Sequence, residues 1–155
     1  GGHKMAGGFS IKKNKINLFK EFIKKKFIKN FSGASEKNNL YLDAFLSPSA
    51  LNEEFFDEIQ LLSPFGPGNS EPVFVLENLK VLKSTIIASK HIKSILIGKN
   101  NDVVKCIAFN SKGTELEPYL STNNKKNIHV AGKLSINDWE GKRNIELIIQ
   151  DIALT

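Results

Sequence analysis

The sequence predicts an α+β protein in which a partial α/β segment is followed by a five-stranded β-barrel. Three observations lead to this prediction: apolar residues recur at helical spacing near the N-terminus, strand-like segments fill the second half, and a stretch rich in proline and glycine separates the two. The chain has 155 residues, of which 41% are hydrophobic and 25% are charged. This composition is typical of one ordinary globular domain or two small ones, and it excludes a disordered tail.

Before the proline-rich stretch, the pattern predicts two strands and two helices. A glycine-rich turn at residues 7–8 is expected to lead into a short strand at residues 9–11. A helix is predicted over residues 16–31, because its apolar side chains are three and four positions apart and share one face, which we expect to be buried. A strand over residues 40–46 and a second helix over about residues 51–62 follow. The apolar stripe of the first helix consists of Ile16, Phe19, Ile23, Phe27 and Phe31.

Residues 63–72 hold three prolines and two glycines, which end the second helix and mark a domain boundary. After it, five segments have the composition of β-strands, with a polar, irregular connection at residues 111–127 between the third and the fourth. Five strands with one long connection at this place outline an oligonucleotide-binding (OB) barrel. A five-stranded SH3-like barrel remains the alternative, because periodicity does not fix the strand order. The five segments are Val73–Ile87, His91–Ile97, Val103–Phe109, Ile128–Ile136 and Asn144–Leu154.

The net charge of +6 is distributed unevenly along the chain. Residues 1–38 hold ten lysines and two glutamates, residues 39–78 hold seven acidic and no basic residues, and residues 79–155 hold twelve basic and seven acidic residues. Two basic segments joined by an acidic one suggest an anionic partner that touches both, such as a nucleic acid. The alternative is a codon bias toward lysine, since 21 lysines stand against one arginine.

Several classes of protein are excluded by what the sequence lacks. No apolar run approaches the roughly 20 residues that span a bilayer, so we expect no membrane partner. The only cysteine, Cys106, excludes an intrachain disulfide and a cysteine-rich zinc site, and it fits the reducing cytoplasm. The chain begins Gly-Gly-His without an initiator methionine and shows no leader, so we expect a cytoplasmic fragment of a longer protein.

The N-terminal residues Gly1, Gly2, His3 and Lys4 are candidates for phosphate binding. Paired glycines let backbone N–H groups approach a phosphate without a Cβ atom in the way, and the two side chains that follow can add donors or charge. The alternative is that glycines at this end serve only a tight turn.

Two motifs resemble known families. The segment GGHKMAGGF is similar to the GGHxxAAGF pattern of DHHA1 domains, which accompany DHH phosphoesterases and alanyl-tRNA synthetases; Gly7 departs from the usual alanine. The segment PFGPGNSEPVF is similar to the PFGxGNPEPxF signature of the RecJ family of single-strand-specific exonucleases, with Ser70 in place of proline. Residues 91–93, 108–110 and 139–152 also resemble the barrel of that family, so the resemblance spans nearly the whole chain.

The resemblance implies the C-terminal part of an exonuclease that digests single-stranded DNA from its 5′ end in recombination and repair. Residues 1–62 would be the end of a DHHA1 domain, residues 63–72 a linker and residues 73–155 an OB domain. Catalysis in the family resembles two-metal hydrolysis with Mn²⁺ or Mg²⁺, whose Asp and His ligands lie in an upstream DHH domain. No Asp-His-His triplet occurs here. We therefore assign no catalytic residue and no metal ligand, and we expect this chain to be inactive by itself.

The barrel is expected to bind DNA through lysines or arginines that contact the backbone and aromatic side chains that stack on bases. For two candidates the alternatives are structural: Trp139 could pack over the barrel mouth, and His91 could satisfy a local carbonyl. Tyr41, Phe74 and Phe109 are expected in the core. The DNA-binding candidates are Lys90, His91, Lys93, Lys133, Trp139, Lys142 and Arg143.

The partner that these interpretations favour is single-stranded DNA, with repair or single-strand-binding proteins as further partners of a monomer. Two other functions remain open. The GGH motif would also suit an alanyl-tRNA synthetase or editing protein that binds tRNA. The barrel could equally be a stand-alone OB-type nucleic-acid-binding module.

Overall fold

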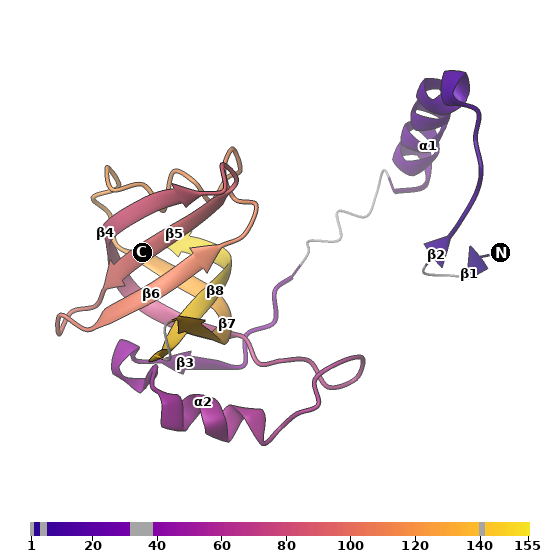
Figure 1. Cartoon of the computed structure of the whole chain (residues 1–155). Coiled ribbons are helices and arrows are strands. Elements are labelled where there is room, and N and C mark those ends of the chain that lie inside the picture. The colour runs from indigo at the N-terminus through magenta and orange to yellow at the C-terminus, as the bar shows by residue number, and fades with distance from the viewer. Residues whose placement is uncertain (1, 4–5, 32–38, 140–141) are drawn as a thin grey trace. The chain divides into compact units, whose positions relative to one another are not determined.

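The structure is a computed structural model that describes residues 2–3, 6–31, 39–139 and 142–155 (Figure 1). It divides into two compact units, Gly1–Asn39 and Leu40–Thr155. Each unit is described by itself below.

The first unit holds a two-stranded pair and one long helix. Strands β1 (Gly2–His3) and β2 (Ala6–Gly7) are antiparallel. A 3₁₀ turn (Lys13–Lys15) then leads into helix α1 (Ile16–Phe31), whose bounds confirm the predicted helix. The strand predicted at residues 9–11 is wrong, because the short strand β2 ends before Gly8 and residues 8–12 belong to no strand.

The apolar face of α1 is exposed, which contradicts the expectation that it forms a core. Phe22 and Phe27 are 54% and 61% exposed, and Ile16 and Ile23 are exposed as well. Phe19 is half-buried and packs its ring 4.6 Å from that of Phe9. The physical reason is size: a unit of one helix and one strand pair has too little surface of its own to cover a stripe of this width.

The second unit contains a closed barrel of five strands. β4 pairs with β5, β5 with β6, β6 with β8, β8 with β7, and β7 again with β4. All these pairings are antiparallel except β6–β8, which is parallel. This strand order confirms the OB barrel and excludes the SH3-like alternative. The strands are β4 (Phe74–Ile87), β5 (His91–Ile97), β6 (Val103–Ala108), β7 (Ile128–Trp139) and β8 (Lys142–Leu154).

The long strand β4 changes partners along its length. Its first residues pair with β7 on one side and with the short parallel strand β3 (Ala44–Leu46) on the other, and its second half pairs with β5. Register shifts interrupt both antiparallel pairings, and Asn78, with a φ of 56°, lies within the shift of the β4–β7 pairing. Such bulges bend a strand and let it serve two parts of a barrel. β3 covers only the end of the predicted strand 40–46.

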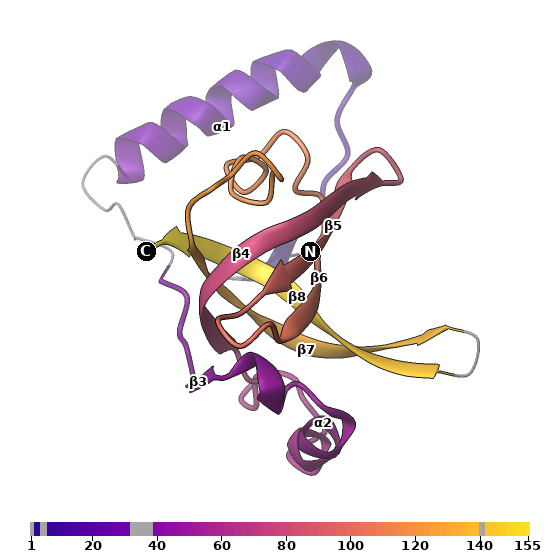
Figure 2. The same cartoon turned by 90° about the vertical axis from the view of Figure 1, so that its left-hand side faces the viewer.

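Helix α2 (Glu53–Gln60) closes one end of the barrel. It follows a 3₁₀ turn (Pro48–Ala50), and the Asn52 side chain caps it by accepting a hydrogen bond from the Phe55 amide at 2.9 Å. Phe56 is buried, and the Phe55 ring meets that of Phe74 edge-on at 5.6 Å. The connection between β6 and β7 covers the other end of the barrel and contributes the fully buried Leu120 (Figure 2).

The segment before the proline-rich stretch is bound directly to the barrel. The Asp43 amide donates to the Val73 carbonyl at 2.9 Å, and the Val73 amide donates to the Asp43 carboxylate at 2.8 Å. The stretch itself is a closed loop, because the Asn69 side-chain amide donates to the carbonyls of Leu62 and Pro64. Residues 40–62 therefore share a compact unit with the barrel. The boundary of the family's domains at 63–72 stays a prediction.

Two of the three aromatic residues expected in the core are exposed. Phe74 is buried, as predicted, but Tyr41 is 84% exposed and Phe109 is 52% exposed. Tyr41 precedes β3 in a segment without regular structure, and Phe109 follows the last residue of β6 on the outer side of the barrel.

The strands β7 and β8 approach each other very closely at Gly132. A Cβ atom at this position would lie 2.3 Å from the Ile148 carbonyl oxygen, and the register of the two strands shifts between Ala131 and Gly132. Only glycine fits such an approach of two backbones.

Candidate nucleic-acid interface

A row of outward-facing side chains crosses four strands of the barrel. Lys93 on β5 is paired with Ile107 on β6, Ile107 with Ile148 on β8, and Ile148 with Lys133 on β7. Their sequence neighbours on β5, β6 and β8, such as Leu147, point inward and are buried. The row therefore presents two aliphatic side chains between two lysines. We call the outer surface of β5, β6, β8 and β7 the barrel face.

Two adjoining grooves lie on the barrel face. The first has a volume of about 450 Å³ and runs from Lys93 to Asn144. The second has a volume of about 260 Å³ and lies beside Ile107, Phe109 and Ile148. Asn137 and Glu146 line both grooves. In OB barrels the face of the second and third strands binds oligonucleotides, and β5 and β6 are these strands here.

Phe109 is the aromatic side chain of the second groove, and His91 holds it in place. The His91 Nδ1 atom accepts a hydrogen bond from the Asn110 amide at 2.9 Å, and its ring meets the Phe109 ring edge-on at 5.1 Å. His91 thus satisfies a local amide and not a local carbonyl, and its direct contact with DNA stays a prediction. A half-exposed ring fixed at the edge of a groove is suited to stacking on a base.

The lysines of the row already have acidic partners. The Lys93 ammonium lies 2.8 Å from Glu146, which is buried, and the Lys133 ammonium lies 3.3 Å from Glu71. A partly exposed pair such as Lys133–Glu71 contributes little to stability, so a phosphate can replace Glu71 at low cost. The Lys93 pair is different, because loss of Lys93 from Glu146 would leave a buried charge uncompensated.

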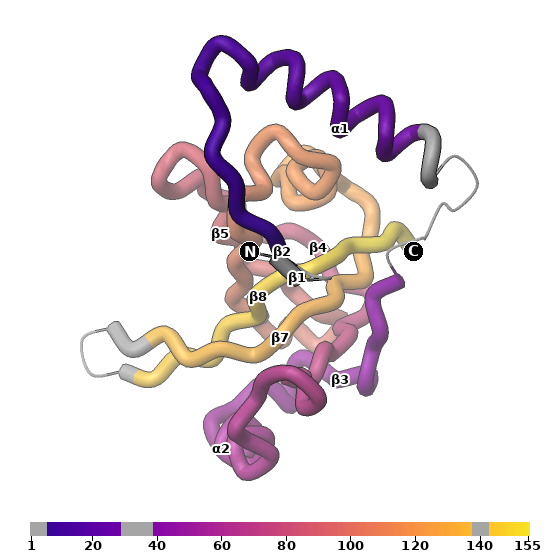
Figure 3. Tube along the Cα trace, turned by 90° about the vertical axis from the view of Figure 1, so that its right-hand side faces the viewer, coloured from indigo at the N-terminus to yellow at the C-terminus, as the bar shows by residue number. Residues whose placement is uncertain are grey.

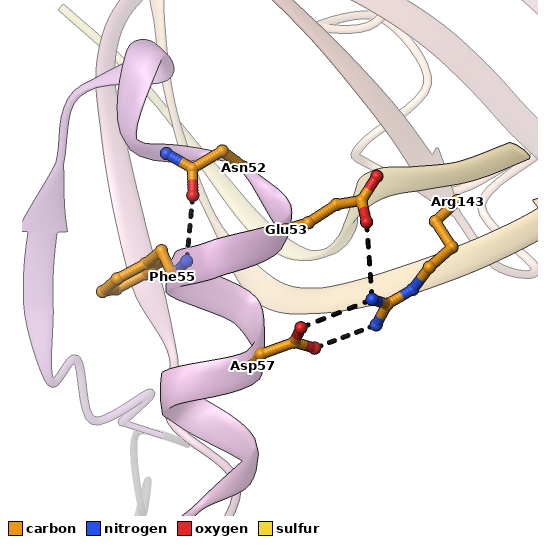
Figure 4. Close-up of polar contacts among 5 residues, drawn as sticks. All are labelled: Asn52, Glu53, Phe55, Asp57 and Arg143. Carbon is orange, nitrogen blue, oxygen red and sulfur yellow. Dashed lines mark hydrogen bonds and ion pairs between the residues drawn. The ribbon is translucent and has the colours of Figure 1, made fainter.

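Arg143 connects the β7–β8 hairpin to helix α2 (Figure 4). Its guanidinium lies 2.9 Å from one carboxylate oxygen of Asp57 and 3.3 Å from the other, and 3.4 Å from Glu53. The described ends of β7 and β8 that face this contact extend beyond the rest of the barrel (Figures 2 and 3). Arg143, which the sequence analysis names as a DNA-binding candidate, is thus in contact with acidic residues of α2. Its contact with DNA stays a prediction.

The contact with Arg143 predicts how Asp57 titrates. Its hydrogen bond to the Arg143 guanidinium lowers the pKa of the Asp57 carboxyl below its usual range, against a smaller opposing effect of desolvation. Because the folded pKa is the lower one, the pair stabilises the fold above the ordinary pKa, and this contribution is lost as the pH falls through the lowered pKa. We expect Arg143→Gln to raise the titration midpoint of the Asp57 carboxyl carbon, measured by NMR. An unmoved Asp57 midpoint would contradict the contact.

Six of the predicted site residues lie wholly or partly outside the described part of the chain. Gly1 and Lys4 are not described, Gly2 and His3 are described only as strand β1, and the phosphate role of all four stays untested. Trp139 and Lys142 end β7 and begin β8, and their side chains lie outside the described residues. Lys90 is exposed in the turn before β5.

The structure adds residues that the sequence analysis missed. The Lys105 ammonium donates to the Asn144 side chain at 2.5 Å in the first groove, and Ile107, Phe109, Ser135 and Asn137 line the second. The signal for part of this set was the alternation along β6, which puts Lys105, Ile107 and Phe109 on one side of the strand.

The described residues offer no group of three His, Cys, Asp or Glu side chains that could hold a metal ion. None of the helices in the described ranges is long and apolar enough to cross a membrane. Burial raises the pKa of the Cys106 thiol, which keeps this side chain a neutral member of the core.

The barrel and its face define an OB-fold domain of the oligonucleotide-binding class. Comparison with protein families makes this more specific, because residues 42–151 match the model of the RecJ OB domain. The chain therefore belongs to the RecJ OB domain family. The match begins just before β3, so it includes α2 and the closed loop as well as the barrel.

RecJ proteins of several bacteria are similar to this chain over almost its whole length. Single-stranded-DNA-specific exonuclease RecJ of Escherichia coli is 27% identical over 154 residues, which are 98% of this chain and 26% of that protein. The same enzyme of Haemophilus influenzae is 30% identical over 155 residues and also 26% covered. The RecJ of Bacillus subtilis is 26% identical, with 19% of its length covered. The chain thus spans about a fifth to a quarter of these relatives.

Solved structures of a RecJ protein also match nearly the whole chain. The crystal structure of Thermus thermophilus RecJ in complex with Mn²⁺ matches 99% of this chain and 21% of that one, with a TM-score of 0.60 and 25% identity. The structure of the same protein with Mg²⁺ matches 94% of this chain, with a TM-score of 0.55 and 23% identity.

Proposed function

We propose that this chain is the C-terminal substrate-binding part of a single-stranded-DNA-specific 5′-to-3′ exonuclease of the DHH phosphoesterase family, acting in DNA recombination and repair. The observation that carries the proposal is the barrel face of a RecJ-type OB domain: a row of lysine, isoleucine, isoleucine and lysine beside a half-exposed phenylalanine. The curated relatives, named as exonucleases specific for single-stranded DNA, support it.

The apolar side chains and the lysines of the barrel face bind different parts of the DNA strand. Phe109, Ile107 and Ile148 offer apolar surface to unstacked bases, and the lysines at both ends of the row attract the phosphates. Because the electrostatic contribution does not depend on sequence, most of the affinity is common to all single strands and falls with salt. The predicted contacts of Trp139, Lys142 and Arg143 would extend this surface along the β7–β8 hairpin, and that of Lys90 would extend it at the turn before β5.

The remaining parts of the proposal concern the whole enzyme. Residues 1–62 would be the end of a DHHA1 domain, in which Gly1, Gly2, His3 and Lys4 hold a phosphate of the substrate. The structural relatives carry Mn²⁺ or Mg²⁺. In this proposal the metal and the hydrolysis belong to the upstream DHH domain of the enzyme. A monomer in the cytoplasm, meeting repair or single-strand-binding proteins, fits the bacterial relatives.

Fluorescence anisotropy with labelled oligonucleotides tests the proposal. The full chain is expected to bind single-stranded DNA more tightly than duplex of the same length, because only unpaired bases can reach the apolar part of the barrel face. If about three phosphates are contacted, the affinity should fall roughly 20-fold between about 50 and 200 mM salt. No binding at low salt, or a preference for duplex, would overturn the proposed function.

One observation favours the second candidate, a stand-alone OB-type binding module: residues 40–155 form a compact unit with their own core. The two candidates differ at the 5′ end. An exonuclease part that holds the terminal phosphate near residues 1–4 should bind a 5′-phosphorylated strand more tightly than an unphosphorylated one. A binding module should not distinguish them. The alanyl-tRNA synthetase alternative explains neither the barrel nor its family match.

A further inference from the structure

The least expected side chain of the barrel face is a buried carboxylate. Glu146 lies on β8 opposite Ser135 of β7, and its neighbour Leu147 points into the core. Glu146 therefore belongs to the outer side, yet it is only 6% exposed, and it lines both grooves. A negative charge at the centre of a surface for a polyanion needs an explanation.

The contacts of Glu146 occupy one of its two oxygens. Oε1 accepts from the Lys93 ammonium at 2.8 Å and from the Asn137 side-chain amide at 3.1 Å. Oε2 makes no hydrogen bond to the described residues. Oε2 is also not fully buried. Among the described residues, the side-chain nitrogen or oxygen atom that is fully buried and has no hydrogen-bond partner is His129 Nδ1, and Oε2 is not such an atom. Oε2 thus keeps free acceptor capacity and remains accessible from the grooves that Glu146 lines.

The chemistry of this oxygen selects its ligand. A carboxylate repels a phosphate and accepts hydrogen bonds, so the group that satisfies Oε2 must be a donor. In single-stranded DNA such donors are the amino groups on the Watson–Crick edges of cytosine, adenine and guanine. In a duplex these edges are paired and cannot reach the floor of a groove. Thymine offers one imino donor between two carbonyl oxygens, which oppose the carboxylate.

Building on the proposed function of the barrel face, we propose that Glu146 is a base-reading acceptor that binds the amino group of an unpaired base. Lys93 and Asn137 fix the carboxylate through Oε1 and leave Oε2 for the ligand. The bound strand then lies with its bases over the grooves and its phosphates at the rim, where Lys133 can exchange Glu71 for a phosphate. The result is a moderate base preference on top of the sequence-independent affinity.

The test compares three oligonucleotides of equal length on the full chain by fluorescence anisotropy: oligo-deoxycytidine, oligo-deoxythymidine, and an oligonucleotide of 2-pyrimidinone, which is cytosine without its amino group. The wild-type chain is expected to bind oligo-deoxycytidine about tenfold more tightly than the other two, the usual effect of a hydrogen bond to a charged acceptor. In Glu146→Gln the charge is lost and one acceptor becomes a donor, so the ratio should fall to about one.

Glu71→Gln is the matched control, because it makes the same change at the partner of the other lysine of the row. It is expected to shift the affinity for all three oligonucleotides by one common factor. If Glu146→Gln did the same, Glu146 would only position Lys93 and the inference would be overturned. The comparison of oligo-deoxycytidine with the 2-pyrimidinone oligonucleotide needs only the wild-type chain. It therefore tests whether the amino group of the base is bound even if Glu146→Gln does not fold. Equal wild-type affinities would refute the inference and leave the proposed function standing. No binding of any strand would refute the proposed function itself.

Discussion

Gly132→Ala is expected to destabilise the barrel by about 4 kcal/mol, a large part of the usual stability of a domain of this size. The added Cβ atom would lie 2.3 Å from the Ile148 carbonyl oxygen and 3.0 Å from its carbonyl carbon, well inside van der Waals contact. Both atoms belong to the backbone of the paired strand, so no side-chain rotation relieves the clash. Either β7 and β8 separate or the register shift at Gly132 is lost.

Urea unfolding followed by far-UV circular dichroism measures this effect. Gly66→Ala is the control, because a Cβ atom at Gly66 would meet nothing within 4 Å. The control is expected to unfold at the wild-type urea concentration. If Gly132→Ala unfolded there too, the close approach of the two strands would be refuted.

Phe109→Ala is expected to weaken binding of single-stranded DNA by about 2 kcal/mol, or roughly 30-fold, which is typical of the loss of one base–aromatic stack. Phe109 is 52% exposed at the second groove and held by His91. No charge is removed, so the slope of affinity against salt should stay the same.

The control for this variant is Phe45→Ala. Phe45 is 68% exposed, but it lies on β3 and outside the barrel face. Anisotropy titrations are expected to give wild-type affinity for Phe45→Ala. An unchanged affinity for Phe109→Ala would place the stacking site elsewhere, for example at Trp139.

The strands of the barrel could be predicted because alternation and turn residues are local properties of the sequence. The position of one long connection favoured the strand order of an OB barrel, and the pairings in the structure were needed to exclude the SH3-like order. The same alternation put Phe109 beside Lys105 and Ile107, but judging Phe109 by its residue type assigned it to the core. The period of a strand tells which residues share a side, and it was the better guide here.

The acidic partners of the cationic residues could not be predicted, because they come from distant parts of the chain. Arg143 and Asp57 are 86 positions apart, and Lys93 meets Glu146 across an intervening strand. Likewise, the spacing of apolar residues fixed the bounds of α1 but not the fate of its apolar face. Burial depends on what packs against a surface, and this information is not in the surface itself.

The split pairing of β4 also constrains the order in which the domain folds. Short turns join β4, β5 and β6, and only two residues separate β7 from β8 in the sequence, so each group can form locally. The ring closes only when β7 reaches β4 and β8 reaches β6 across the connection of residues 109–127. Closing this loop costs entropy before the new contacts repay it, which makes closure the slow step. The barrel face spans both groups of strands, so the nascent chain acquires its affinity for DNA last, once the ring is complete.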